Sequence, residues 1–249
     1  MSDSSVDSSE VSDFKEILSM TLSGQLPLLV GGHAVNLWAI VYRERVGRGL
    51  DRWLPLTSKD LDLVGTIDLL EAMKKNFGGD FRLAGPRSPI VGQLIANLHG
   101  VDRKIDVLRD VFGLNPKDLS AESAVLDIEF DGEIFEARVL PILTLLQAKV
   151  ANLAKLDQAK RNDFKHVSIM LLVAREYLTE LIVAAESGAA DSRAAIGPLE
   201  HFRKIVASPD ALKCSSVRGI EFDSVWPREL LTAAKDPRIQ NFVKHRLPS

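Results

Sequence analysis

The sequence has few of the features that would assign it to a specialised structural class. It contains one cysteine, Cys214, in 249 residues, which excludes an intrachain disulfide and a cysteine-cluster metal site. Its apolar runs are too short to span a bilayer, and its first residues lack the basic and apolar regions of a secretion signal. We therefore expect a cytoplasmic protein that has no membrane among its partners.

The chain also lacks a large excess of either charge. Its 34 acidic and 31 basic residues give a formal net charge of −3, which argues against a protein that coats nucleic acid by charge alone. A local basic patch is still compatible with this balance. The 46% hydrophobic and 26% charged residues are ordinary for a globular protein, and the length allows one large domain or two modest ones.

Composition divides the chain into three parts. Met1 to Asp13 contains six serines and four acidic residues, which predicts a disordered or flexible tail over residues 1–13. Residues 14–140 mix strand-like and helix-like patterns, whereas the pattern from residue 141 onward is helical. We therefore expect an α+β domain over 14–140 and a C-terminal helical domain over 141–249.

The most informative stretch begins with the apolar run Leu26 to Val30. This run predicts a short buried strand that breaks at Gly31 and Gly32, where the backbone can approach a ligand closely. Periodic apolar residues then predict a helix packed on the sheet. Because a helix start presents free N–H groups and a positive dipole end, the glycine pair is a candidate phosphate cradle.

Asp60 and Asp62 lie in the next strand-like pattern. Alternation along a strand places both carboxylates on one face and Leu61 on the other. Two carboxylates so placed suit Mg²⁺, which takes carboxylate and phosphate oxygens. A third acid, Asp106, is flanked by apolar residues in the strand-like segment Lys104 to Leu108, an unfavourable place for an idle carboxylate. Such an acid can face the pair across the sheet.

Between these acids, two further elements have well-marked ends. Ile67 to Phe77 predicts a helix that stops at two glycines, and Ile90 to Leu98 predicts a strand that enters a turn at His99-Gly100. The segment Lys104 to Leu108 is then the returning strand of a hairpin.

Three features outside this core each leave two interpretations open. Lys149 lies within an apolar helical stripe, so its ammonium either reaches the edge of that stripe or points at an anion in a cleft. Asp163, in the first turn of a long predicted helix, is either a simple cap or a functional acid. The segment Arg43 to Arg52 contains four arginines and is either a solvated loop or a mobile loop that contacts phosphate or an acceptor.

These motifs resemble those of the DNA polymerase beta superfamily of nucleotidyltransferases, and more narrowly its AbiEii/AbiGii toxin-like branch. The resemblance covers roughly residues 26–173 and rests on three segments: Gly31-Gly32-His33-Ala34, Thr57-Ser58-Lys59-Asp60-Leu61-Asp62-Leu63 and Lys104-Ile105-Asp106-Val107-Leu108. In that branch a downstream helical region supplies a lysine and an aspartate, and Lys149 and Asp163 fit this pattern.

The resemblance implies a mixed sheet flanked by helices and a C-terminal helical region. It also implies transfer of a nucleoside monophosphate from a nucleoside triphosphate such as ATP to an RNA end, for example that of tRNA, or to a protein hydroxyl. The implied cofactor is Mg²⁺ or Mn²⁺. A toxin of a toxin-antitoxin or phage-defence system, with an antitoxin partner, is the corresponding biological expectation.

The resemblance also assigns roles to individual residues. The implied metal ligands are Asp60, Asp62 and Asp106. The further implied catalytic residues are Lys149 and Asp163. The implied nucleotide-binding residues are Gly31, Gly32, His33, Ser58 and Lys59.

Many members of the superfamily carry Gly-Ser after the strand, whereas this chain carries Gly-Gly-His. His33 therefore either contacts a phosphate or base, or is a packed or capping histidine. The alternative function is a catalytically inactive relative that binds nucleotide or a partner protein through the same fold. A sugar-nucleotide glycosyltransferase is disfavoured, because its Asp-x-Asp donor site needs neither a Gly-Gly helix start nor a third strand acid.

Overall fold

The structure, a computed structural model, describes residues 8–115, 119, 123–130 and 132–247. Its internal contacts divide the chain into two compact units. The sheet unit comprises Met1–Val41 and Trp53–Leu145, and the helical unit comprises Tyr42–Arg52 and Leu146–Ser249. None of the helices in the described residues has the length and hydrophobicity that a bilayer crossing requires.

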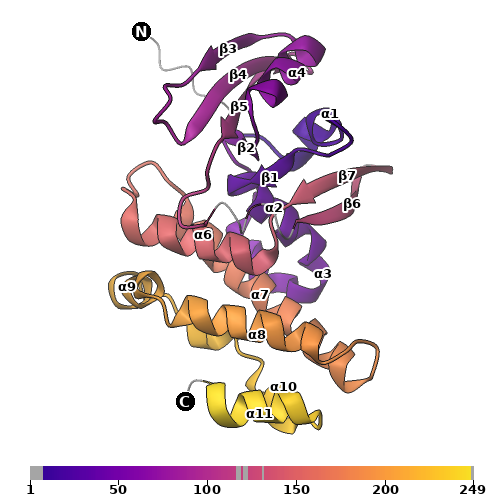
Figure 1. Ribbon diagram of the computed structural model, residues 1–249, viewed down its shortest axis with the longest axis vertical. Helices are drawn as coiled ribbons and strands as arrows, with labels where there is room; N and C mark the ends of the chain where they lie inside the picture. The colour runs from indigo at the N-terminus through magenta and orange to yellow at the C-terminus, as the bar shows by residue number, and fades with distance from the viewer. Residues whose placement is uncertain (1–7, 116–118, 120–122, 131, 248–249) are drawn as a thin grey trace. The chain divides into compact units, whose positions relative to one another are not determined.

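Within the described residues, the sheet unit is built on a mixed sheet of seven strands in the order β3-β4-β5-β2-β1-β7-β6 (Figure 1). The pairs β2–β5 and β1–β7 are parallel, and the other neighbours are antiparallel. The strands are β1 (Leu28–Val30), β2 (Asp60–Val64), β3 (Asp80–Leu83), β4 (Ile90–Leu98), β5 (Val101–Leu108), β6 (Ala124–Phe130) and β7 (Glu133–Val139). The prediction of an α+β fold with a mixed sheet and flanking helices is confirmed.

The strand and helix patterns in the sequence reappear in the sheet unit. Its helical elements are η1 (Val11–Phe14), α1 (Lys15–Leu18), α2 (Gly31–Val41) and α4 (Ile67–Phe77). Helix α4 and strand β4 have the predicted bounds. In β2, Leu61 and Leu63 are fully buried, whereas Asp60 and Asp62 are half-buried. Alternation along β2 therefore separates an apolar face from an acidic one.

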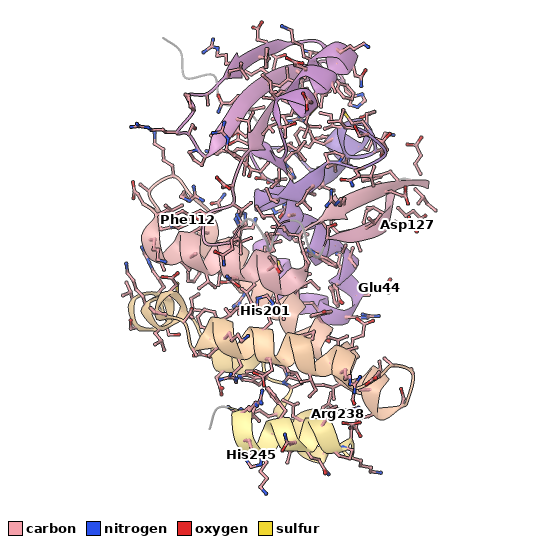
Figure 2. The ribbon with its side chains drawn as sticks, in the orientation of Figure 1. Glu44, Phe112, Asp127, His201, Arg238 and His245 are labelled. Atoms are coloured by element: carbon pink, nitrogen blue, oxygen red, sulfur yellow. The ribbon has the colours of Figure 1, made fainter. Side chains whose placement is uncertain are left out.

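The helical unit contains the C-terminal helices, which were also predicted. Its elements are α3 (Arg43–Val46), η2 (Gly47–Trp53, whose last residue belongs to the sheet unit), most of α6 (Ile142–Lys155), α7 (Asp163–Glu186), α8 (Arg193–Val206), α9 (Pro209–Arg218), η3 (Phe222–Val225), α10 (Arg228–Ala233) and α11 (Pro237–Arg246). Trp226 packs edge-on against Phe202, with 4.8 Å between ring centroids. His201 of α8, labelled in Figure 2, lies 3.0 Å from Gln147 of α6 (Nε2 to Oε1). The unit therefore combines an aromatic core with polar contacts between helices.

The N-terminal segment differs from the prediction of a flexible tail over residues 1–13. Residues 1–7 lie outside the described residues, but Ser9 pairs with Ser58 through two backbone hydrogen bonds of 2.8 and 3.0 Å. Val11 and Phe14 are fully buried. Within the predicted tail, the backbone bridge of Ser9 and the buried side chain of Val11 therefore attach residues that low apolar content had assigned to a flexible segment.

The boundary between the two units also differs in detail from the predicted one at residues 140 and 141. The sheet unit extends to Leu145, and Tyr42–Arg52 belongs to the helical unit. This segment, expected as a loop, forms α3 and η2. Glu180 of α7 explains the grouping, since it accepts a 2.9 Å hydrogen bond from the Tyr42 hydroxyl and pairs with Arg45.

Candidate active site

The acidic residues of β2 and β5 lie side by side. The parallel register sets Asp62 opposite Asp106, and Asp60 opposite Lys104. Because residues opposite each other project on the same side of a sheet, these four side chains share one face. Sequence alternation predicted the pairing of Asp60 with Asp62 on one face, and the register brings Asp106 to the same face.

The three acids differ in exposure. Asp60 and Asp62 are half-buried, whereas Asp106 is buried. Burial raises the pKa of the Asp106 carboxyl above its ordinary value, and the hydrogen bond and charge of Lys104 offset part of this rise. Among the described residues, Asp106 Oδ1 is buried without a hydrogen-bond partner. Gln93, opposite Asp106 on β4, also lowers the pKa of Asp106 through a side-chain hydrogen bond, so this carboxylate has polar neighbours on both adjoining strands.

Lys104 is the residue that sequence reasoning overlooked. Its ammonium nitrogen lies 3.0 Å from Asp106 Oδ2 and 3.3 Å from Asp60 Oδ2. Burial lowers the pKa of Lys104, but the two carboxylates outweigh burial and hold that pKa above its usual value. Since Lys104 and Asp106 are two residues apart on a predicted strand, the period of two could have placed them on one face.

Gly31 lies directly against Asp62. Val30, the last residue of β1, is opposite Asp62, and α2 begins at the next residue, where Gly31 adopts a positive φ of 69°. A Cβ atom at this position would lie 1.9 Å from Asp62 Oδ2. Only glycine therefore fits this turn, on both conformational and steric grounds. The predicted helix start at the glycine pair is present, and it adjoins an acid of the cluster.

The other predicted nucleotide-binding residues lie near this turn in different settings. Gly32 follows Gly31 in α2 and is buried. Ser58 is occupied through its backbone, which pairs with Ser9, and the Ser9 hydroxyl donates a further 2.9 Å hydrogen bond to the Ser58 carbonyl. Lys59 is exposed. Of these residues, Lys59 therefore offers the side chain most accessible to a ligand.

His33 is the packed histidine that the sequence allowed as one of two interpretations. It is fully buried, and its ring contacts Phe14 edge-on with 5.0 Å between centroids. The hydroxyl hydrogen of Ser9 is directed at Ser58, so His33 Nε2–H is the donor in its 3.2 Å contact with Ser9 Oγ. Burial, assisted by the charge of Arg103, lowers the pKa of His33 to about 3. The imidazole is therefore neutral and structural in this conformation.

In the helical unit, the structure brings Lys149 and Asp163 together. The Lys149 ammonium lies 3.6 Å from Asp163 Oδ1, and both side chains are almost completely buried, at 7% and 2% exposed. Arg161 Nε lies 2.5 Å from Asp163 Oδ2. Asp163 thus holds two cations at the start of α7. The arrangement gives this acid a clear structural role, and the predicted catalytic role stays a prediction.

The candidate metal ligands match the chemistry of a divalent ion in part. Carboxylate oxygens suit Mg²⁺ or Mn²⁺, and the partnerless Asp106 Oδ1 fits a coordinating oxygen. Across the described part of the chain, however, no group of three or more His, Cys, Asp or Glu side chains converges as a metal site. The Lys104 ammonium lies between Asp60 and Asp106. The chemistry of the carboxylates therefore suits a divalent ion, whereas their present arrangement does not bring three ligands together.

A comparison with models of known protein families finds no match for this chain, and a comparison with curated proteins finds none. The functional interpretation therefore depends on the residues themselves.

Proposed function

We propose that the protein is a metal-dependent nucleotidyltransferase that moves a nucleoside monophosphate from a nucleoside triphosphate to an RNA end. The observation that carries this proposal is the register of β2 and β5, which sets Asp62 opposite Asp106 on the face that also bears Asp60. A cluster of three carboxylates on one sheet face is costly for a protein that makes no use of it.

In this proposal each part of the site has a distinct task. Asp60, Asp62 and Asp106 would hold Mg²⁺ or Mn²⁺, which when bound neutralises phosphate charge and activates the attacking hydroxyl. Gly31 lets the chain turn from β1 into α2 against Asp62, so the positive end of the α2 dipole lies beside the acids. The β- and γ-phosphates would bind at this helix start, and Lys59 is exposed to reach them.

The reaction exchanges one phosphorus–oxygen bond for another. The acceptor hydroxyl oxygen bonds to the α-phosphorus, the bond from that phosphorus to the bridging oxygen breaks, and pyrophosphate leaves with the electron pair. The hydroxyl proton is released. Because little covalent chemistry falls to the protein, positioning and charge dominate the contribution of its side chains.

The experiment that tests the proposal is transfer of label. Purified protein with Mg²⁺ and each α-labelled nucleoside triphosphate, alone and with total RNA, is expected to label RNA, and Asp60→Ala is expected to lower the rate at least a hundredfold. Asp110→Ala removes an exposed carboxylate just beyond β5 and serves as the matched control. Label in the protein would redirect the acceptor to a protein hydroxyl. Transfer that is equal in Asp60→Ala and wild type would refute the site.

A toxin role in the cytoplasm, with an antitoxin as partner, is the biological setting that the resemblance suggests. It belongs to the same proposal, because a toxin of this kind would act by transferring nucleotide to an RNA that the cell needs. Growth arrest on expression, relieved in Asp60→Ala, is the expected phenotype.

One observation favours the alternative of an inactive relative. Lys104 already neutralises part of the acidic cluster, as a cation in a site that has lost its metal would do. This alternative predicts that nucleoside triphosphate binds without turnover in the labelling assay.

A further inference from the structure

A cation supplied by the chain itself, Lys104, lies between two of the three acids. Lys104 lies opposite Asp60 and two residues before Asp106 on β5, so all three side chains extend from one face. Its ammonium contacts one oxygen of each acid, at 3.3 and 3.0 Å. A metal ion held by Asp60 and Asp106 on this face would therefore lie within reach of the Lys104 ammonium.

We propose that Lys104 is a tethered counter-cation of the acidic site, which a divalent metal ion must displace from Asp60 and Asp106. The inference rests on the proposed function in one respect, namely that these acids bind a metal. Beyond the proposed function, the inference assigns to Lys104 the role of setting how tightly the three acids bind the metal ion.

The charge balance supports this role. Asp60, Asp62 and Asp106 carry up to three negative charges on one face, and Lys104 offsets one of them. An ammonium at hydrogen-bond distance and a Mg²⁺ ion at about 2.1 Å cannot use the same lone pair of an oxygen, and the two cations repel each other. Metal binding and the Lys104 contacts therefore compete for the negative charge of these oxygens and for the space beside them.

The surroundings of Lys104 allow the exchange. Its side chain is 27% exposed, whereas that of Asp106 is 9% exposed, so the lysine has a route to solvent that the acid lacks. Four flexible methylenes let the ammonium move without a change in the backbone of β5. Asp106 Oδ1, buried and without a hydrogen-bond partner in the described residues, gives the ion a first oxygen, and the ion then meets Lys104 at Oδ2 of the same carboxylate and at Asp60 Oδ2.

Lys104 would thereby serve the site in both states. Without metal, it limits repulsion between acids that would otherwise face one another unpaired. With metal present, it competes, so the site fills only above a threshold concentration of divalent ion. A lysine with a purely structural role would have the opposite effect on binding, because its loss would disorder the acids and weaken the site.

The test is a titration of the full-length protein with Mn²⁺, in which electron paramagnetic resonance measures the free ion. Lys104→Met keeps the length of the side chain and removes its charge, and we expect at least tenfold tighter Mn²⁺ binding than in wild type. Lys75→Met removes an exposed charge from α4 and should leave the affinity unchanged. Lys104→Gln, with a polar end, provides a second variant if Lys104→Met does not fold.

Thermal unfolding of the same proteins provides an independent measurement. The apo form of Lys104→Met should melt below wild type. The same excess of Mn²⁺ should raise its melting temperature by more than it raises that of wild type, because at a fixed ligand concentration the stabilisation grows with the logarithm of the affinity. Mn²⁺ affinity that is unchanged, weaker or undetectable in the folded Lys104 variants would overturn the inference.

The outcomes separate this inference from the proposed function. Tighter Mn²⁺ binding without any transfer of label would support the role of Lys104 and leave the protein a metal-binding relative without the activity. Transfer of label with unaltered Mn²⁺ affinity in the Lys104 variants would support the enzyme and reject the role of Lys104.

Discussion

Each of the two units places a lysine against aspartate. Acidic side chains outnumber basic ones in the cluster on the sheet, whereas basic side chains outnumber acidic ones in the cluster of the helical unit. On the sheet, Lys104 contacts Asp60 and Asp106 on a face that also bears Asp62, and Asp106 Oδ1 has no hydrogen-bond partner among the described residues. In the helical unit, one acid, Asp163, pairs with both Lys149 and Arg161. The side chains of Asp163 and Lys149 are almost completely buried.

The difference indicates which cluster is organised for a ligand. A surplus of acids with access to solvent can exchange its cation, whereas a single buried acid with two cations has its charge already satisfied. We therefore expect substitutions in the helical cluster to affect folding first, and substitutions in the sheet cluster to affect metal binding first. The predictions below test this division.

The largest expected effect is on folding of the helical unit. Asp163→Ala would remove the carboxylate from buried Lys149, and loss of one partner of a buried pair lowers the free energy of unfolding by about 3–5 kcal/mol. Urea denaturation measures this change. Asp157→Ala, an exposed acid in the loop before α7, is the matched control and should cost less than about 1 kcal/mol.

The opposite result would break the division. If Asp163→Ala unfolds like wild type but loses transfer of label, then Asp163 serves the reaction, as the family resemblance implies. Lys149→Met should separate the same two roles, since a structural lysine alters stability whereas a phosphate ligand alters affinity for nucleoside triphosphate.

The sheet unit also contains one ionisable group that serves folding, His33. Its pKa is about 3 in the folded protein against 6.5 as the ordinary value. The unfolded chain therefore binds the proton first, and stability is fully present above about pH 6.5 and is lost as the pH falls toward 3. His33 should contribute a loss of about 1.4 kcal/mol per pH unit between pH 6 and 4.

Denaturation curves at several pH values measure this slope. His33→Gln should remove its contribution, whereas His245→Gln, on the exposed surface of α11 (labelled in Figure 2), should keep it. An unchanged slope in His33→Gln would mean that the imidazole is protonated or exposed in solution, and the packed interpretation would then fail.

Gly31 links the fold of the sheet unit to its acids. Gly31→Ala should cost about 2 kcal/mol, because alanine is strained at a φ of 69° and its Cβ would meet Asp62 Oδ2. Gly24→Ala shares a positive φ of 77° but has no atom within 4 Å of the added Cβ. Gly24→Ala should therefore show the backbone strain without the steric clash, and should lower the free energy of unfolding by about 1 kcal/mol.

Mn²⁺ titration completes this comparison. Only Gly31→Ala should weaken Mn²⁺ binding, since it displaces Asp62, whereas Gly24→Ala should bind like wild type. Equal Mn²⁺ affinity in the two variants would separate Asp62 from the metal site.

Sequence alone predicted those parts of the fold that depend on local pattern. Helix α4 and strand β4 have ends marked by glycine, proline and periodicity, and their bounds matched. The face shared by Asp60 and Asp62 followed from alternation. The sequence also allowed Asp106 to face this pair, and the register confirms it, but local pattern could not fix that register because it depends on which strands become neighbours.

Contacts between distant segments were beyond local reasoning. Burial of Val11 depends on neighbours supplied by the folded sheet unit, and the attachment of Ser9 depends on Ser58, 49 residues away. Patterns of neighbouring residues cannot report such partners. Lys104 is different, since its relation to Asp106 was visible in the sequence as a separation of two residues.

The smallest expected effect comes from the exposed pair of Arg45 and Glu180, in the segment that was predicted as a loop. These side chains are 53% and 44% exposed, so solvent screens their attraction. A double-mutant cycle with Arg45→Ala and Glu180→Ala should give a coupling free energy below about 1 kcal/mol. The same type of cycle on Lys149 and Asp163 should give a larger one. If the two couplings are equal, burial does not decide the cost of these charges, and the contrast between the two lysine clusters loses its physical basis.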